Sequence, residues 1–210
     1  MDTIYKSDTK RVFLTFDDGP SPVTSKILDI LKQENVKATF FILGSNVDSR
    51  KDVVKRMYEE GHYLANHGYS HTYSKIYSSP QSVLDEYNEC NDKVKNAIEV
   101  PDYNSHLFRF PGGLAGGKYA EIKKEAKELL LQNNIVNVDW NALTGDAETN
   151  NLSLEFEMTR LTETMGSKNS LVILMHDAAA KSVTADALPQ IIAKLKEEGY
   201  EFKNFYDIIK

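Results

Sequence analysis

The sequence is poor in several features, and each shortage excludes a class of protein. A single cysteine, Cys90, leaves no partner for an intramolecular disulfide. No segment approaches the roughly 18 to 20 apolar residues that a membrane-spanning helix needs. The 25 lysine and arginine residues are outnumbered by 31 acidic ones, for a net charge of −6. Because no basic cluster is interleaved with aromatic residues, nucleic-acid binding is not expected.

Two further features of the sequence are its single cysteine, Cys90, and its polar N-terminal residues. Cys90 lies in a stretch with helical apolar spacing and has no adjacent base, so it is expected to pack as a small hydrophobe. The first eleven residues are polar and lack the apolar segment of a signal peptide. The first expected strand begins at Arg11, which would suit a domain cut from a longer exported chain.

Short apolar runs alternate with amphipathic helical stretches along the whole chain. This alternation predicts an α/β fold with a parallel sheet and outer helices, either closed as a barrel or open and doubly wound. The expected strands are 11–16, 37–43, 62–65, 106–109, 135–140, 171–175 and 200–202. The expected helices include two that begin at Ser-Pro pairs, at 21–22 and 79–80, and others at 53–58, 119–132, 153–165 and 186–198. No repeat or linker divides residues 1–210, so we expect one domain.

Unusual polar residues follow the expected strands. They are Asp17, Asp18, the segment 66–71 (Asn-His-Gly-Tyr-Ser-His), Arg109, Asp139, Asp146 and His176. In parallel α/β folds, the carboxyl ends of the strands meet on one face and carry the functional groups. Residues far apart in the sequence are therefore expected to form one site.

Two pairs of residues indicate a metal. Asp17 and Asp18 are costly if both are charged and buried, so alone they also fit a solvated Asp-Gly-Pro turn. His67 and His71 can share a metal if their segment makes a helical turn or a tight loop. Asp18 with the two histidines offers one oxygen and two nitrogens, which suits zinc, cobalt or a similar divalent ion.

Two further residues have both an ordinary and a functional interpretation. His176 follows a strongly apolar run and is either a surface histidine or a general acid. Arg109 stands between two phenylalanines, as a stacking residue or as a partner for a buried carboxylate.

Four segments together resemble the polysaccharide deacetylases, the chitooligosaccharide deacetylase-homology domain of carbohydrate esterase family 4. They are 15–20 (Thr-Phe-Asp-Asp-Gly-Pro), 67–71 (His-Gly-Tyr-Ser-His), 109–113 (Arg-Phe-Pro-Gly-Gly) and 174–176 (Leu-Met-His). Their order is that of the family, and the resemblance runs from about Arg11 to His176. It implies a distorted (β/α) barrel with about seven parallel strands.

The resemblance also implies roles for individual residues. The metal would be bound by Asp18, His67 and His71. Asp17 would be the catalytic base, held by Arg109, and His176 the acid. Leu174 would line a pocket for the acetyl methyl group.

The sequence departs from the family pattern at two places. Gly112 stands where the family usually has a tyrosine; its backbone N–H can still stabilise an oxyanion, but the aromatic wall of the groove is lost. Trp140 is expected to contact substrate. The segment that begins with it lacks the first aspartate of the family's motif, which in the family tunes the acid histidine. Asp146 is expected to replace it, and Asp139 is a second candidate.

The function that the resemblance implies is metal-dependent hydrolysis of the N-acetyl group of N-acetylglucosamine in peptidoglycan or chitooligosaccharides, with release of acetate. The alternatives are an O-acetyl esterase acting on xylan or another acetylated polysaccharide, a catalytically weakened glycan-binding module, and a protein that keeps only the fold. The resemblance further implies an extracellular or cell-wall location, and we expect a monomer.

Overall fold

The computed structural model describes residues 2–209, in which short parallel strands form one curled sheet. The hydrogen-bonded order is β5-β4-β3-β2-β1-β7-β6, and β8 pairs with β1 beside this path. The strands are β1 (Arg11–Asp17), β2 (Thr39–Ile42), β3 (Tyr63–Asn66), β4 (Leu107–Phe108), β5 (Val136–Asn137), β6 (Ala142–Leu143), β7 (Ser170–His176) and β8 (Glu201–Lys203). The expected distorted barrel of about seven parallel strands is confirmed.

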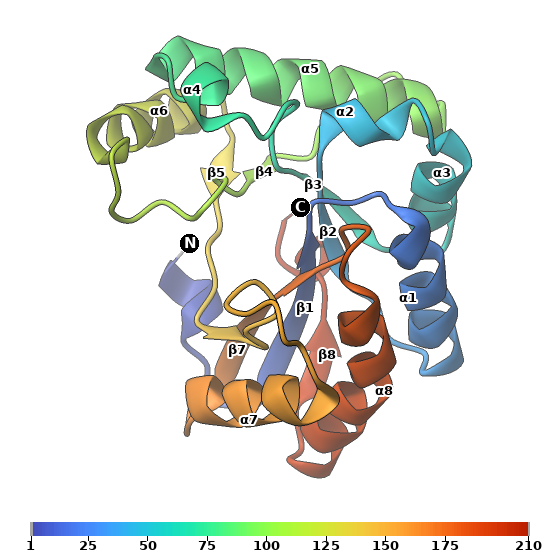
Figure 1. Ribbon diagram of the computed structural model, residues 1–210. Coiled ribbons are helices and arrows are strands. Elements are labelled where there is room, and N and C mark those ends of the chain that lie inside the picture. Colours follow the sequence, from blue (N-terminus) through green and yellow to red (C-terminus); the bar gives the residue numbers. More distant parts are fainter. Residues whose placement is uncertain (1, 210) are drawn as a thin grey trace.

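Helices connect the strands and surround them, as Figure 1 shows. They are α1 (Pro22–Gln33), α2 (Gly44–Val47), α3 (Lys51–Glu59), α4 (Tyr73–Ile76), α5 (Pro80–Ile98), α6 (Ala120–Gln132), α7 (Leu154–Met165) and α8 (Ser182–Glu197), with 3-10 turns η1 (Asp2–Tyr5) and η2 (Phe205–Asp207). Ser21 and Ser79 cap α1 and α5 with their side chains, and a proline follows each. Both predicted Ser-Pro helix starts are therefore confirmed.

The two edges of the curled sheet are joined by only four residues, 138–141, between β5 and β6. The Val138 N–H donates to the Phe108 carbonyl at 3.0 Å on one edge, and the Asn141 N–H donates to the Val172 carbonyl at 3.1 Å on the other. The strand predicted over 135–140 is confirmed only at Val136–Asn137, because beyond these residues the chain crosses from one edge of the sheet to the other. The last long helix also begins earlier than predicted, at Ser182 rather than Asp186.

The alternation of side chains along β1 separates the outer core from the barrel interior. Val12, Leu14 and Phe16 pack in the cluster that joins the sheet to the helices. Phe13 packs instead with the inner apolar cluster, which includes Phe205 of η2. The next residues on the inner face of β1 are Thr15 and Asp17, so the interior changes from apolar to polar toward the carboxyl end of the strand.

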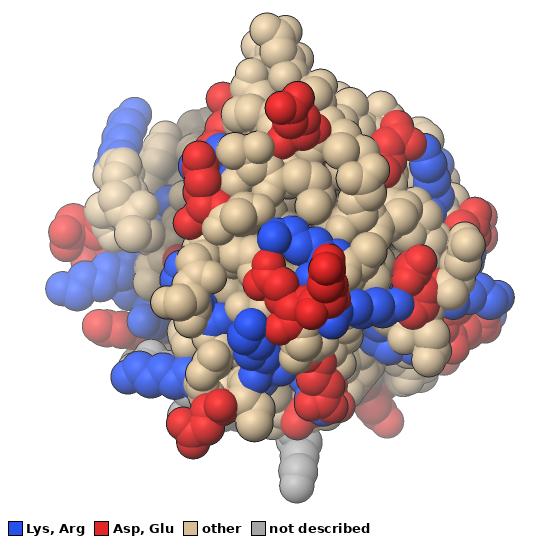
Figure 2. Space-filling model, turned by 90° about the horizontal axis from the view of Figure 1, so that it is seen from below, with Lys and Arg blue, Asp and Glu red and all other residues tan. Residues whose placement is uncertain are grey.

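Within residues 2–209, no helix combines the length and apolarity needed to cross a bilayer. Figure 2 views the molecule from below, the side on which α7 and α8 lie in Figure 1. On this face acidic and basic side chains lie among one another, and neither sign forms a broad continuous patch.

Candidate active site

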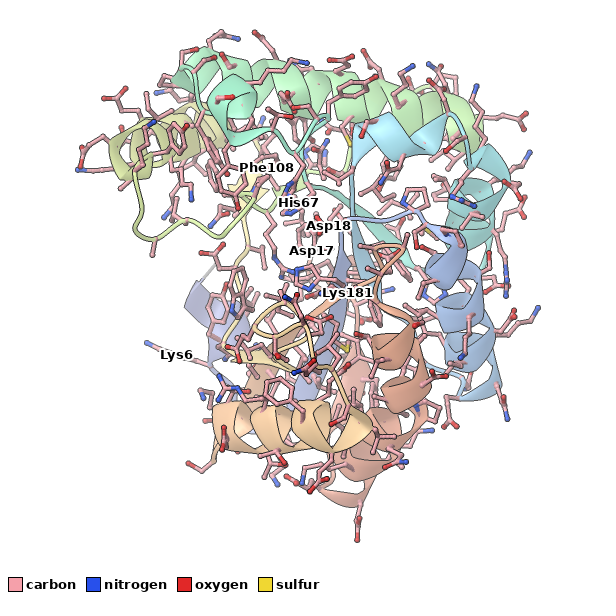
Figure 3. All side chains as sticks on the ribbon, viewed as in Figure 1. Lys6, Asp17, Asp18, His67, Phe108 and Lys181 are labelled. Atoms are coloured by element: carbon pink, nitrogen blue, oxygen red, sulfur yellow. The ribbon has the colours of Figure 1, made fainter. Side chains whose placement is uncertain are left out.

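The carboxyl ends of β1, β3, β4 and β7 bring the predicted polar residues together. Asp17 ends β1 and lies in register with His176 at the end of β7. Asn66 of β3 pairs with Phe108 of β4, so His67 and Arg109 leave the sheet at the same level. Figure 3 shows Asp17, Asp18 and His67 clustered at the centre of the molecule.

Asp18, His67 and His71 form a group whose ligand atoms all lie within 4.8 Å of one another. The Nε2 atoms of His67 and His71 are each 3.5 Å from Asp18 Oδ1. That oxygen is buried and has no hydrogen-bond partner within the described part of the chain. An orphaned carboxylate oxygen facing two imidazole nitrogens fits a divalent cation of the zinc type, because such an ion would satisfy all three atoms.

The histidine-bearing segment is a tight loop rather than a helical turn. Gly68 has φ +84° and His71 has φ +53°, both in the left-handed region. Glu86 of α5 holds the loop: its Oε2 accepts the backbone N–H groups of Tyr69 and Ser70 at 2.8 and 2.6 Å, and its Oε1 accepts the Ser70 hydroxyl at 2.5 Å. The spacing of the two histidines is therefore maintained from a helix outside the motif.

A hydrogen bond sets the tautomer of His67. Its Nδ1 lies 2.7 Å from the Arg109 carbonyl oxygen. Because a carbonyl can only accept, Nδ1 carries the proton and the lone pair of Nε2 is left facing Asp18. Burial lowers the pKa of His67 to about 3, against the opposing effect of Asp18. The neutral imidazole is the form that binds a metal.

Asp17 is buried and is held by Arg109. Arg109 Nη1 donates to Asp17 Oδ1 at 2.7 Å and to the Thr15 hydroxyl at 2.8 Å. Its other nitrogens donate to the carbonyls of Val138 and Asp139, so the guanidinium is fixed although it is fully buried. Burial raises the pKa of Asp17, while the charge of Arg109 opposes that rise. The second oxygen, Oδ2, is 3.8 Å from His67 Nε2.

His176 is paired with Asp146 rather than with Asp139. Its Nδ1 lies 2.7 Å from Asp146 Oδ1, and its backbone N–H donates to Asp146 Oδ2 at 2.7 Å. Asp139 instead accepts the Leu114 N–H on Oδ2. Burial lowers the pKa of His176, but its hydrogen bond to Asp146 and the charges of Asp146, Asp17 and Asp18 raise it to about 9.

The space beside Gly112 is taken by a tyrosine from another element. Gly112 has φ +75°, and a Cβ placed there would lie 2.5 Å from the hydroxyl of Tyr73 in α4. The Tyr73 ring is 40% exposed and its centroid is 5.6 Å from that of His71. Tyr73 thus fills the space that a side chain at position 112 would need. Leu174, two residues before His176 on the same face of β7, is largely buried.

Trp140 is not brought to the metal-ligand group. A groove next to Asp18 and His71 is lined by Pro20, Leu43, Asn46, Ser49, Arg50 and Ala178, among others. Trp140 lines a different hollow, with Tyr5 and Leu114. Its ring packs over Gly113 and lies 5.7 Å from the guanidinium of Arg109, so its contact with the site is indirect.

Sequence reasoning missed the residues that support the site. Glu86 and Tyr73 contact the motif residues but lie outside the four motif segments, and Thr15 begins the first segment but was given no role of its own. A strand-parity argument would have found Thr15, because it lies on the same face of β1 as Asp17. Nothing in the sequence points to Glu86 or Tyr73, since their proximity depends on how α4 and α5 pack.

Comparison with known proteins places this geometry in a family. A family model described as polysaccharide deacetylase matches residues 5–132. The chain is 38% identical over 92% of its length to a putative polysaccharide deacetylase, YheN, of Bacillus subtilis, and 33% identical over 95% to a peptidoglycan-N-acetylglucosamine deacetylase of Bacillus cereus. It spans 66% and 71% of those two proteins. A Streptococcus mutans CE4 esterase superposes with a TM-score of 0.88 at 34% identity, covering 97% of this chain and 90% of that one. The chain belongs to the polysaccharide deacetylase family.

Proposed function

We propose that the chain is a metal-dependent N-deacetylase that removes the acetyl group from N-acetylglucosamine units of a glycan. The observation that carries the proposal is the orphaned Asp18 Oδ1 between two histidine Nε2 atoms, with Asp17 and His176 beside it in register. Family membership and the B. cereus relative named for N-acetylglucosamine deacetylation support the same reaction. Asp18, His67 and His71 would hold the ion, which when bound polarises the acetyl carbonyl and acidifies a water.

Asp17 is suited to take the proton of the attacking water. Its Oδ1 is occupied by Arg109, so Oδ2 is the oxygen left for that proton. Burial raises the pKa of Asp17 and makes the carboxylate a stronger base, while Arg109 keeps it anionic. Arg109 also prevents the side chain from turning away, because it is itself held by three protein oxygens besides Asp17.

His176 is suited to supply the proton that the leaving nitrogen needs. Nδ1–H is directed at Asp146 Oδ1, so Nε2–H faces the site. The water oxygen bonds to the acetyl carbon as the carbonyl double bond opens to an oxyanion. When the oxyanion collapses, the carbon–nitrogen bond breaks and His176 protonates the leaving amine. The Gly112 N–H stabilises the oxyanion and Leu174 contacts the methyl group. The products are acetate and a free amino sugar, and the proton on Asp17 balances the one that His176 has given.

The finer properties belong to the same proposal. Zinc suits the two-nitrogen, one-oxygen set best, with cobalt as an alternative. A peptidoglycan or chitooligosaccharide substrate implies action outside the cell or at the cell wall. We expect the protein to act as a monomer. The groove beside Asp18 and His71 would hold the sugar, and the ring of Tyr73 lies next to the His71 ring at its side.

Acetate release separates the candidate activities. The zinc-loaded protein is expected to release acetate from N-acetylated chitooligosaccharides or peptidoglycan faster than from acetylated xylan. Preference for xylan would indicate an O-acetyl esterase. Binding of either glycan without any acetate release would indicate a binding module and contradict the proposal.

Substitutions distinguish the role of the catalytic base from that of the metal ligands. Asp17→Asn is expected to keep zinc but lower kcat roughly 10²- to 10⁴-fold, because the amide cannot take the water proton. His71→Ala is expected to lose zinc and turnover together. Zinc content by atomic absorption and acetate release are measured on the same samples. Wild-type turnover in Asp17→Asn would exclude Asp17 as the base.

A further inference from the structure

A buried carboxyl group that the proposed reaction does not use lies near Asp146. Glu157 of α7 is completely buried, and its Oε2 has no hydrogen-bond partner within the described residues. Its Oε1 is 3.2 Å from the hydroxyl oxygen of Thr184 in α8. A buried carboxyl group without full hydrogen bonding is costly, so its position between two helices calls for a physical explanation.

Thr184 links Glu157 to the partner of His176. Its hydroxyl oxygen lies 3.1 Å from Asp146 Oδ2 and 3.2 Å from Glu157 Oε1. A threonine hydroxyl has one proton, so it can donate to only one of these two oxygens. If both carboxyl groups were anionic, the Thr184 oxygen would face one of the two carboxylate oxygens with no proton between them, and both atoms would be acceptors.

A proton on Glu157 resolves this conflict. Glu157 then donates to the Thr184 oxygen, and Thr184 donates to Asp146 Oδ2, so every contact has a donor and an acceptor. Burial and the charge of Asp146 raise the pKa of Glu157 to about 7, against the hydrogen bond with Thr184 and the charge of Lys181. Asp146 and Lys181 are the charged groups that face it from the neighbouring segments.

We propose that Glu157 and Thr184 are positioning residues that fix the Asp146 carboxylate against His176. Asp146 Oδ2 accepts the His176 backbone N–H at 2.7 Å and the Thr184 hydroxyl at 3.1 Å, and Oδ1 is left for His176 Nδ1 at 2.7 Å. Neither residue touches the reacting atoms. Their effect on catalysis rests on the proposed function, in which His176 is the acid.

Thr184→Val tests the link by removing the hydroxyl while keeping the shape of the side chain. We expect kcat for an N-acetylated chitooligosaccharide to fall about tenfold with KM and zinc content little changed, as for other groups that orient a reacting residue. Thr184→Ser, which keeps the hydroxyl, should recover most of that loss. Thr162→Val on the exposed side of α7 is the matched control, since the Thr162 hydroxyl donates to the Met158 carbonyl one turn earlier in the same helix.

A second readout does not depend on activity. Nitrogen-15 NMR of zinc-loaded protein gives the titration midpoint of His176, which should fall in Thr184→Val and return in Thr184→Ser, because a loosened Asp146 supports the imidazolium less. An unchanged or higher midpoint, or wild-type kcat in Thr184→Val, would overturn the positioning role. If the wild-type protein releases no acetate, the proposed function fails while the NMR midpoints still decide this inference.

Variants of Glu157 keep the proposal testable if Thr184→Val does not fold. Glu157→Gln retains an amide donor for the Thr184 oxygen, whereas Glu157→Leu has a similar volume and no donor. The His176 midpoint should be lower in Glu157→Leu than in Glu157→Gln. Equal midpoints in these two variants would contradict a role for Glu157.

Discussion

At the scale of single residues, the neighbours Asp17 and Asp18 differ because of their backbone conformations. Asp17 is the last residue of β1 and its side chain lies inside the barrel, where Arg109 holds it. Asp18 has φ +75°, and its carboxylate is directed at His67 and His71. Two chemically identical side chains therefore face different partners, and the proposed mechanism assigns them different roles.

The pairing of Asp146 with His176 leads to a prediction about pH. A histidine donates its proton only while protonated, so a raised pKa keeps the acid form to higher pH. Asp146→Ala removes the main interaction that raises the pKa of His176 to about 9. We expect the alkaline limb of kcat against pH to move to lower pH, with activity near pH 8 reduced roughly 10²-fold.

The pH profile of Asp146→Ala is compared with that of Asp139→Ala. Asp139 contacts the Leu114 N–H and not His176, so its loss should leave the alkaline limb in place. If both variants keep the wild-type limb, the proton donor in the proposed mechanism is not His176.

Residue types explain why part of the site could be predicted and part could not. Asp18, His67 and His71 carry recognisable chemistry at recognisable spacing, and the structure places them together. Sequence reasoning left Asp139 and Asp146 as alternatives, because the chain crosses from one edge strand to the other here and spacing alone does not say which carboxylate reaches β7. Tyr73 was missed because only the packing of α4 places its hydroxyl over Gly112.

At the scale of elements, local signals defined most of the fold. The Ser-Pro starts of α1 and α5 and the apolar run of β7 are readable because caps and buried strands depend on neighbouring residues. The break between β5 and β6 is not readable, since it depends on how far the sheet curls. The short helices α2 and α4 also lack a full period of apolar residues.

The packing of α7 against α8 yields a prediction about stability. Glu157 has an ordinary pKa near 4.5 and a folded-state pKa of about 7. Between these values the unfolded chain loses the proton while the folded protein keeps it, so stability falls as pH rises from about 4.5 to 7 and levels off above that. Glu157→Gln cannot ionise and should escape this loss. Its free energy of unfolding at pH 8 should exceed that of wild type by at most about 3 kcal/mol.

Urea unfolding of wild type and Glu157→Gln at several pH values measures this difference. The gain should be large at pH 8 and should disappear well below pH 4.5, where Glu157 is protonated in both states. Glu163→Gln is the control on the same helix, because Glu163 is exposed and pairs with Arg160 at the surface. A gain that does not depend on pH would show that Glu157 is not protonated in the folded protein.

At the scale of the whole molecule, the metal-ligand group joins two loops that follow different strands. Asp18 lies between β1 and α1, and His67 and His71 lie between β3 and α4. The three residues form one site only when β1, β2 and β3 are paired in register. A cation bound there is therefore bound by the folded protein and not by the unfolded chain, which couples metal binding to global stability.

This coupling predicts a metal-dependent melting temperature. At a zinc concentration 100 times Kd, binding contributes about 2.7 kcal/mol, which for a domain of this size raises Tm by roughly 5 to 10 °C. Calorimetry with zinc and after chelation measures the change. His71→Ala should lose the increase, whereas Asp17→Asn should largely retain it, because Asp17 is held by Arg109 and is not one of the three proposed ligands. An equal increase in wild type and His71→Ala would mean that zinc stabilises the protein elsewhere, and the Asp18–His67–His71 site would have to be abandoned.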